Sequence, residues 1–209
     1  MIFHIQLANA IYARAFRLLY GWRFRAFGRG TSVVFPAGIE SPGNIGLGEG
    51  VYVGYRSYLA AVPHTSATQC LLEIGDGCSI GRFNHIYATQ RVVLGKHVLT
   101  ANGVYISDNV HGYRDVTVPI LQQPIRQNGV VEIGEGSWIG HNACILGVRI
   151  GRHCVVGANA VVTHDMPDFS VAVGAPATII RRYDPDTRIW RTTYPDGGFK
   201  QQPSVSPYA

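Results

Sequence analysis

The chain has 209 residues, of which 46% are hydrophobic and 15% are charged, and its formal net charge is +5. This hydrophobic content excludes a disordered chain and supports one core without requiring a second domain. The basic residues are scattered and gather only near the N-terminus, which favours anionic partners but no nucleic acid. The cysteines, Cys70, Cys78, Cys144 and Cys154, show neither metal-ligand nor disulfide spacing, so we expect free, buried thiols.

The first predicted element is an amphipathic helix over residues 1–27. Apolar residues recur at helical spacing, accompanied by Arg14, Arg17, Arg23 and Arg25. The charges follow the apolar run, the reverse of a secretory signal peptide, and no run of roughly 18 apolar residues predicts a membrane span. Two interpretations stay open: the helix covers the end of the following structure, or it lies on an anionic membrane surface.

A six-residue repeat dominates the chain from Ile74 to Val162. An aliphatic residue is followed by a small one at Ile74-Gly75, Ile80-Gly81, Leu94-Gly95, Ile106-Ser107, Ile133-Gly134, Ile139-Gly140, Ile150-Gly151 and Val156-Gly157. This period is typical of a parallel β-helix, in which the aliphatic side chain points inward and its small neighbour permits a tight corner. Helices and ordinary sheets have other periods. We predict about four or five coils.

Three segments depart from the repeat. Residues 60–71 are predicted to form a loop, and residues 110–130 contain two prolines and no hexad. An excursion of about twenty residues is rare in a compact domain, and such loops are usually functional. Pro167 and Pro176 end the regular coil, and residues 168–182 are expected to form a short extended pair that closes it.

Five stretches between Leu94 and Arg182 form a specific set. They are residues 106–113 (ISDNVHGY), 119–125 (PILQQPI), 137–140 (SWIG), 161–167 (VVTHDMP) and 174–177 (GAPA). In this order and spacing they resemble the hexapeptide-repeat acyltransferases, close to the maltose, galactoside and exopolysaccharide O-acetyltransferases. The resemblance implies an all-β, left-handed parallel β-helix, although crossovers between parallel strands are nearly always right-handed.

We therefore divide the chain into three parts: an N-terminal amphipathic helical segment, 1–27; a left-handed β-helix acyltransferase domain, 28–182, with a catalytic loop at 110–130; and a C-terminal tail, 183–209. The tail is polar and contains prolines. It is expected either to be exposed or to clasp a neighbouring subunit.

His111 begins the long loop and is the strongest catalytic candidate. A general base needs a pKa near the working pH and access to substrate, and a histidine at a loop root meets both demands. The resemblance implies that His111 takes the proton from an acceptor hydroxyl, which attacks the thioester of acetyl-CoA. It also implies that Asn84 bonds the acceptor or the reacting centre. Asp108 would orient His111, and both Asn84 and Asp108 have the alternative role of turn residues.

The resemblance implies a binding site for acetyl-CoA on the late hexads. Trp138 would wall a pocket between subunits and cover the cofactor arm. The backbone amides of Gly140, His141, Gly157 and Ala158 would hold the pantetheine arm, because small residues permit close approach.

Basic residues near the end of the coil would meet the phosphates. Arg181, followed by Arg182, stands in a suitable place, with a solvated basic pair as the alternative. His164 stands where relatives usually have lysine, which weakens a phosphate contact there. Asn109 replaces a histidine that many relatives carry two positions before the base.

The prediction is an acetyl-CoA-dependent O-acetyltransferase acting on a sugar hydroxyl, in cell-surface polysaccharide biosynthesis. An amine acceptor would need the same base, so N-acetylation stays open. The family is trimeric, and we expect a homotrimer in which His111 of one chain faces Trp138 of the next. We expect a cytoplasmic protein, with residues 1–27 as a contact to the inner face of the membrane.

Two other classes of protein share part of this pattern. Zinc-dependent γ-type carbonic anhydrases share the coil but need histidines five positions apart, and the residue five after His111 is Val116, so no metal is expected. A non-catalytic scaffold or binding coil would explain the hexads. It would not explain the His111 loop, Trp138 and the Gly-Ala-Pro-Ala turn together.

Overall fold

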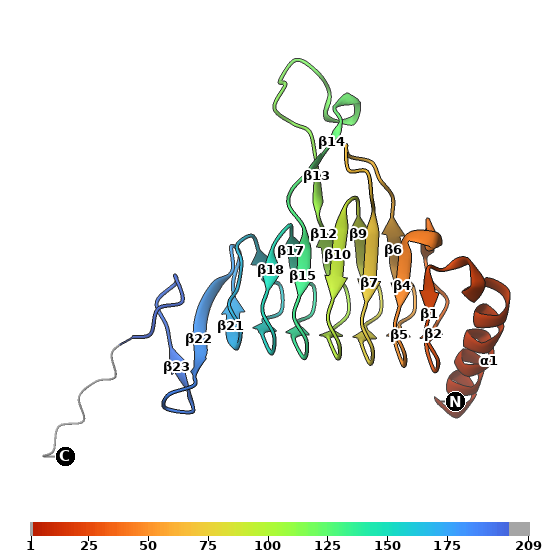
Figure 1. The fold of residues 1–209 in the computed structure, drawn as a ribbon, viewed down its shortest axis with the longest axis horizontal. Coiled ribbons are helices and arrows are strands. Elements are labelled where there is room, and N and C mark those ends of the chain that lie inside the picture. Colours follow the sequence, from red (N-terminus) through yellow and green to blue (C-terminus); the bar gives the residue numbers. More distant parts are fainter. Residues whose placement is uncertain (1, 201–209) are drawn as a thin grey trace, which may run out of the picture.

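The molecule is a prism of stacked coils with a helix at one end and an arm on one side (Figure 1). This computed structural model describes residues 2–200, and the side chains of residues 7–200. Met1 and residues 201–209, the last part of the predicted tail, lie outside the described residues.

Three sheets of parallel strands form the faces of the prism, and the chain visits them in turn. Face A contains β1 (Ala26–Phe27), β4 (Ile45–Leu47), β7 (Leu71–Ile74), β10 (Arg91–Leu94), β15 (Val131–Ile133) and β18 (Arg149–Ile150). Face B begins with β2 (Ser32–Val33), β5 (Tyr52–Val53), β8 (Ser79–Ile80), β11 (Leu99–Thr100), β16 (Trp138–Ile139) and β19 (Val155–Val156). Face C contains β3 (Gly38–Glu40), β6 (Tyr58–Ala61), β9 (His85–Ala88), β12 (Tyr105–Ser107), β17 (Cys144–Leu146) and β20 (Val161–Val162).

The prediction of a parallel β-helix is confirmed, but the number of coils was wrong. Faces A and C each contain six strands, so the described chain makes six coils. The prediction missed the first coil because residues 26–40 carry no regular hexad. That coil, closed by the 3-10 turn η2 (Pro42–Asn44), is shaped by its contacts with the next one.

The hexad side chains fill the interior as predicted. At most 3% of the surface is exposed on Ile74, Ile80, Leu94, Ile106, Ile133, Ile139, Ile150 and Val156. The small residues beside them are required by the stacking of the corners. A Cβ atom on Gly134, for example, would lie 2.4 Å from the backbone nitrogen of Arg152 in the next coil. In each repeat, therefore, the aliphatic residue fills the core and the small residue permits the close spacing of the coils.

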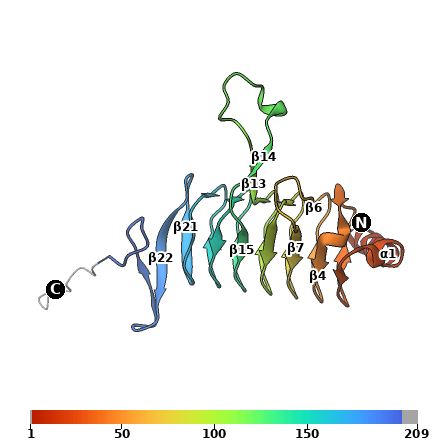
Figure 2. The ribbon, with the colours of Figure 1, turned by 45° about the horizontal axis from the view of Figure 1, so that its top comes forward.

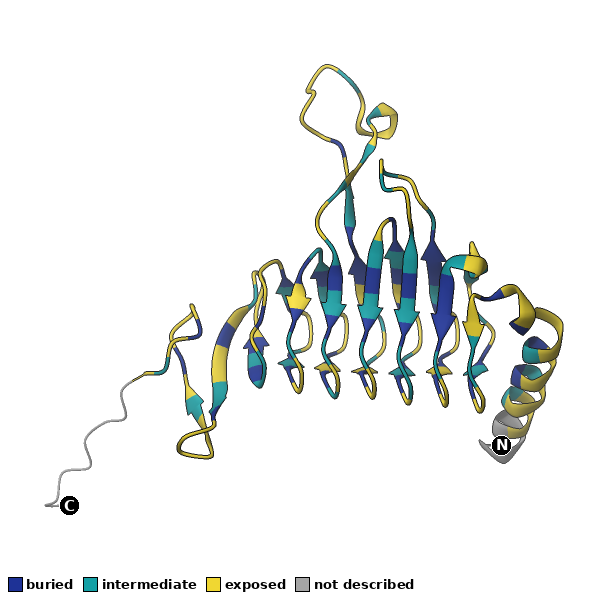
Figure 3. Ribbon diagram, in the orientation of Figure 1, coloured by how far each residue is buried: buried dark blue, intermediate teal, exposed yellow. Residues whose placement is uncertain are grey.

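Helix α1 (Ile2–Tyr20), followed by η1 (Gly21–Arg23), packs against β2 at the N-terminal end of the prism. Its inner face buries Ala13 and Phe16. Tyr12 stacks on Phe35 with ring centroids 3.8 Å apart. The helix thus covers the first coil, and its opposite face is exposed (Figure 3).

The C-terminal end is formed by strands that reverse direction. Strand β21 (Ser170–Val173) pairs antiparallel with β22 (Thr178–Asp184), which pairs antiparallel with β23 (Ile189–Thr192). The extended pair expected over 168–182 corresponds to β21 and β22. The described part of the tail extends this sheet instead of hanging free.

A hairpin arm replaces the predicted structureless loop at 110–130. Strands β13 (Asn109–His111) and β14 (Ile125–Gln127) pair antiparallel, with the 3-10 turn η3 (Ile120–Gln122) between them. The arm projects from the edge between faces C and A (Figures 1 and 2). The loop after β6 supports its base, where the Thr65 hydroxyl donates to Gln127 Oε1 at 3.1 Å.

Candidate active site

His111 lies on β13, at the base of the arm, and its side chain is exposed. Pairing with Ile125 of β14 fixes its backbone just beyond the edge of the coil. An acceptor can reach the imidazole from solvent, as a general base requires.

Among the described residues, the side chain of Asp108 forms no hydrogen bond with His111. Its carboxylate is fully buried and points back into the coil. Five donors surround its oxygens at 2.8–3.2 Å: the backbone N–H groups of Thr89, Gln90 and Arg91, the Thr89 hydroxyl and the Asn109 side-chain amide. The carboxylate thus holds the preceding turn of the coil beneath the arm. The turn-residue alternative is the one that the structure supports.

Asn84 also serves a corner of the coil. Its side chain is 1% exposed, and its amide donates to the carbonyls of Ala101 at 2.9 Å and Arg82 at 3.3 Å. Its Oδ1 atom is buried and has no hydrogen-bond partner among the described residues. An acceptor outside the coil cannot contact this side chain, so the predicted acceptor role does not fit this structure.

Trp138 projects from face B and is 48% exposed. It pairs in register with Leu99 of the preceding coil and Val155 of the following coil. The same row continues through Val171 to Arg181. Since neighbouring strands lie about 4.8 Å apart, about 14 Å separates Trp138 from Arg181 along this row. The row is long enough to seat an extended ligand.

The backbone positions expected to meet the pantetheine arm stand together. At the corner from face B to face C, two consecutive coils carry Gly140, His141, Gly157 and Ala158. The N–H of Gly140 donates to the carbonyl of Val156 at 2.8 Å. A Cβ atom on Gly140 would lie 2.6 Å from the Ala158 nitrogen, so coil stacking alone requires this glycine.

The remaining basic candidates, His164 and the pair Arg181 and Arg182, lie in different parts of the structure. His164 lies at the edge between faces C and A, where its Nδ1 atom is 3.0 Å from the Thr163 hydroxyl. It lines a cavity of about 440 Å³ with Pro176 and Asp196. Arg182 turns away from Arg181 and donates to the Gly197 carbonyl at 3.3 Å. Within one chain, therefore, His111 and His164 share one edge, while Trp138 and Arg181 stand on face B.

A polar aromatic cluster on face C was missed by the sequence analysis. Tyr58, His85 and Tyr105 form an outward stack, with ring centroids 4.7 and 5.4 Å apart. Next to them the Tyr87 hydroxyl lies 2.9 Å from Nδ1 of His64. The available signal was tyrosine and histidine at outward positions of consecutive hexads. The cluster lies beside the base of the arm, because Tyr87 pairs in register with Ser107 of β12.

The cluster changes the titration of its members. Burial lowers the pKa of His85, and the Glu40 carboxylate opposes that shift. Burial, followed by a hydrogen bond with Glu40, raises the pKa of Tyr58 to about 12. Both shifts favour the neutral forms of these side chains.

Acidification is expected to destabilise the protein partly through His85. As the pH falls below the ordinary value of 6.5, the unfolded chain takes up a proton that the folded protein resists, so stability decreases. The His85→Gln variant should therefore lose less of its melting temperature than the wild type between neutral and mildly acidic pH. His97 lies in an exposed turn, so the control variant His97→Gln should lose as much of its melting temperature as the wild type. Equal slopes for wild type and His85→Gln in thermal denaturation would contradict this assignment.

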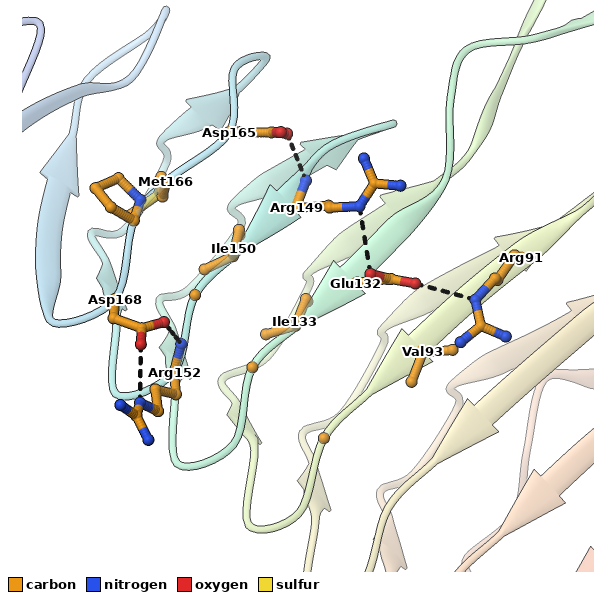
Figure 4. A pocket seen from close by; sticks show the side chains of 14 residues that line it. Arg91, Val93, Glu132, Ile133, Arg149, Ile150, Arg152, Asp165, Met166 and Asp168 are labelled. Atoms are coloured by element: carbon orange, nitrogen blue, oxygen red, sulfur yellow. Dashed lines mark hydrogen bonds and ion pairs between the residues drawn. The ribbon is translucent and has the colours of Figure 1, made fainter.

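A hollow of about 830 Å³ lies on face A (Figure 4). It contains none of the predicted site residues. The Glu132 carboxylate bridges Arg91 at 3.0 Å and Arg149 at 3.3 Å, and Arg152 pairs with Asp168 at 2.8 Å. These charged side chains of the hollow neutralise one another, so they offer no free group for chemistry. Among the described residues, no three His, Cys, Asp or Glu side chains are grouped as metal ligands.

The comparisons place the chain among known proteins. A family model described as the hexapeptide repeat of succinyl-transferase matches residues 130–164. The Escherichia coli protein named "Putative lipopolysaccharide biosynthesis O-acetyl transferase WbbJ" is 32% identical, over 79% of this chain and 86% of its own. A Mycobacterium tuberculosis protein named as a probable acetyltransferase is 38% identical over 65% of this chain. The match spans only 43% of that relative's length.

Two solved structures are similar. AntD, an N-acyltransferase from Bacillus cereus in complex with dTDP and 3-hydroxybutyryl-CoA, has a TM-score of 0.68 at 18% identity. The match covers 82% of this chain and 89% of that chain, and it shows the fold alone. PerB from Caulobacter crescentus, in complex with CoA and GDP-perosamine, has a TM-score of 0.52 at 25% identity, over 73% of this chain and 58% of its own.

The stacked hexad coils define a parallel β-helix protein, with His111 on an arm at one edge. The chain belongs to the hexapeptide-repeat acyltransferase family, a family of enzymes, which confirms the resemblance. No helix among the described residues is long and apolar enough to cross a membrane.

Proposed function

We propose that this protein transfers an acetyl group from acetyl-CoA to a sugar hydroxyl in cell-surface polysaccharide biosynthesis. The observation that carries the proposal is the exposed His111 at the base of the arm, in a chain whose face B bears the row from Trp138 to Arg181. The name of WbbJ supports the reaction. The CoA and GDP-perosamine bound by PerB support the two kinds of substrate.

His111 acts as the general base in this proposal. Its neutral imidazole accepts the proton of the acceptor hydroxyl, and the oxygen attacks the thioester carbonyl carbon. The carbon–sulfur bond breaks, an ester forms, and the protonated imidazole returns the proton to the departing thiolate. No covalent acyl-enzyme is needed when both substrates meet at one site.

The donor is proposed to lie along face B. Trp138 covers the pantetheine arm, and Arg181 contributes a positive charge at the far end of the row. The length of the row from Trp138 to Arg181 supports the binding of an extended ligand such as this arm. The backbone of residues 140–141 and 157–158 borders it at the next corner.

A homotrimer is proposed because the three faces differ in chemistry. Outward positions of face A carry ion pairs, including Arg25 with Glu73 at 3.1 Å. Face B exposes Leu99 and Trp138, and the corner between faces B and C exposes Phe35, Tyr55 and Phe83. Burying this corner at a threefold axis would remove apolar surface from water and leave face A in solvent.

This packing would also complete the site. With that corner at the axis, face C of one copy meets face B of the next. The arm leaves the edge between faces C and A, so it would reach over face B of the next copy. His111 and His164 of one chain would then face Trp138 and Arg181 of its neighbour. Residues 28–182 are proposed as the catalytic unit, with 110–130 as its catalytic loop.

Calorimetric titration with acetyl-CoA tests the donor site. The wild type is expected to bind, and Trp138→Ala is expected to weaken binding about tenfold or more, as loss of a central aromatic contact does. Trp190→Ala is a matched control, because Trp190 is 46% exposed and lies on β23. Absence of binding to the wild type would favour a non-catalytic coil. Equal losses in both variants would remove Trp138 from the site.

A further inference from the structure

Helix α1 has two apolar faces, and the coil uses only one of them. The inner face packs Ala13 and Phe16 against the first coil. On the outer face, Leu7, Ile11 and Leu18 are 51%, 58% and 80% exposed. The spacing of 7, 11, 14 and 18 places them in one stripe with Arg14. A helix that only covers the coil would have a polar outer face.

Trp22 extends the stripe beyond the end of the helix. It lies in η1, is 79% exposed, and its indole N–H donates to the Leu19 carbonyl at 3.0 Å. Leu19 itself is 62% exposed. Tryptophan with an apolar ring and a polar edge suits the boundary between lipid and water.

The formal charge of the chain is concentrated in the same region. Residues 1–39 contain five arginines and no lysine or acidic residue, whereas the rest of the chain contains 13 basic and 13 acidic residues. The whole net charge of +5 therefore belongs to these first 39 residues. An anionic surface is the matching partner.

Two of these arginines are available for such a surface. Arg17 donates to the Gly28 carbonyl, while Arg25 and Arg29 pair with carboxylates of the coil. Arg14 and Arg23 are exposed, and within the described side chains of residues 7–200 no carboxylate forms an ion pair with either. Arg14 interrupts the apolar stripe, and Arg23 adjoins Trp22. Apolar and cationic groups thus share one outward surface.

We infer that this outward surface of α1 and η1 lies on a bilayer that contains anionic lipid. The apolar side chains enter the headgroup region and the arginines meet the phosphates. A second copy of this chain is a poorer occupant, because equivalent contacts would bring unneutralised arginines together. The surface lies at the end of the prism, away from the arm (Figures 1 and 2), so the bound protein keeps the arm accessible.

Sedimentation with vesicles tests the inference on the full chain. The wild type is expected to bind vesicles of phosphatidylcholine mixed with phosphatidylglycerol, and not vesicles of phosphatidylcholine alone. The double variant Leu18→Gln/Trp22→Gln should bind at least about tenfold less. Each of Arg14→Gln and Arg23→Gln should weaken binding about fivefold, and added salt should weaken it further.

The control is Leu121→Gln/Trp190→Gln, which removes an exposed leucine and tryptophan far from α1. It should bind the vesicles as the wild type does. Failure of the wild type to bind, or equal binding by Leu18→Gln/Trp22→Gln, would overturn the inference. If Leu18→Gln/Trp22→Gln instead changed the oligomeric state in light scattering, the surface would belong to an interface between copies. None of these readouts requires acyl transfer.

Discussion

His111→Ala is expected to lower kcat for acyl transfer about 10²- to 10⁴-fold, the usual contribution of a general base. Acetyl-CoA affinity should change little, because in the proposed mechanism His111 acts on the acceptor hydroxyl and not on the donor. The side chain is exposed, so its removal leaves no cavity in the core. Release of thiol from acetyl-CoA, measured with a panel of sugars and sugar nucleotides as acceptors, gives the rate.

The pH dependence supplies a second readout. A general base acts only in its unprotonated form, so the wild-type rate should rise with pH, and the residual rate of His111→Ala should lack this rise. His97→Ala, in an exposed turn between faces A and B, is the matched control and should retain the wild-type rate. Transfer by His111→Ala at the wild-type rate would exclude His111 as the base.

Asp108→Ala is expected to destabilise the protein by about 3–5 kcal/mol, because it leaves several buried donors without an acceptor. For a chain of this size the melting temperature should fall by about 10 °C. Thermal denaturation at one fixed protein concentration measures this loss. Asp115→Asn alters an exposed carboxylate on the arm and should change the melting temperature by only a degree or two, about 0.5 kcal/mol.

The same variant separates two roles for Asp108. A residue that oriented His111 would lower the rate and leave stability intact. The hydrogen bonds instead predict that loss of stability accompanies any loss of rate, since the turn of Thr89 to Arg91 and the base of the arm come loose together. An Asp108→Ala protein with wild-type stability and a lower kcat would restore the orienting role.

The coil was predictable because its information is local. Each inward aliphatic residue, such as Ile106 or Ile139, is followed directly by its own corner residue. A single hexad is therefore enough to predict both the buried position and the turn. The arm was not predictable in this way. Its strands pair residues 109–111 with residues 125–127 as an antiparallel backbone ladder, and no periodicity in the sequence marks that pairing.

In the candidate site, too, features set by local sequence could be predicted, and features set by distant residues could not. Trp138 was correctly expected to point away from the coil, because it occupies an outward hexad position beside the buried Ile139. The direction of Asp108 and Asn84 depends on turns of neighbouring coils, 17 to 19 residues away in sequence, with which they form hydrogen bonds. The pair of His64 and Tyr87 likewise arises from a loop that returns to face C.

The two ends of the prism have a consequence for polymer growth. A ladder of parallel strands that stops abruptly is a template for the next strand, and unprotected ladders grow into fibres. Here α1 lies over the first coil, while β22 and β23 run antiparallel and break the pattern that another coil would need. Among the described residues, both ends of the ladder are therefore shaped against the addition of another parallel coil.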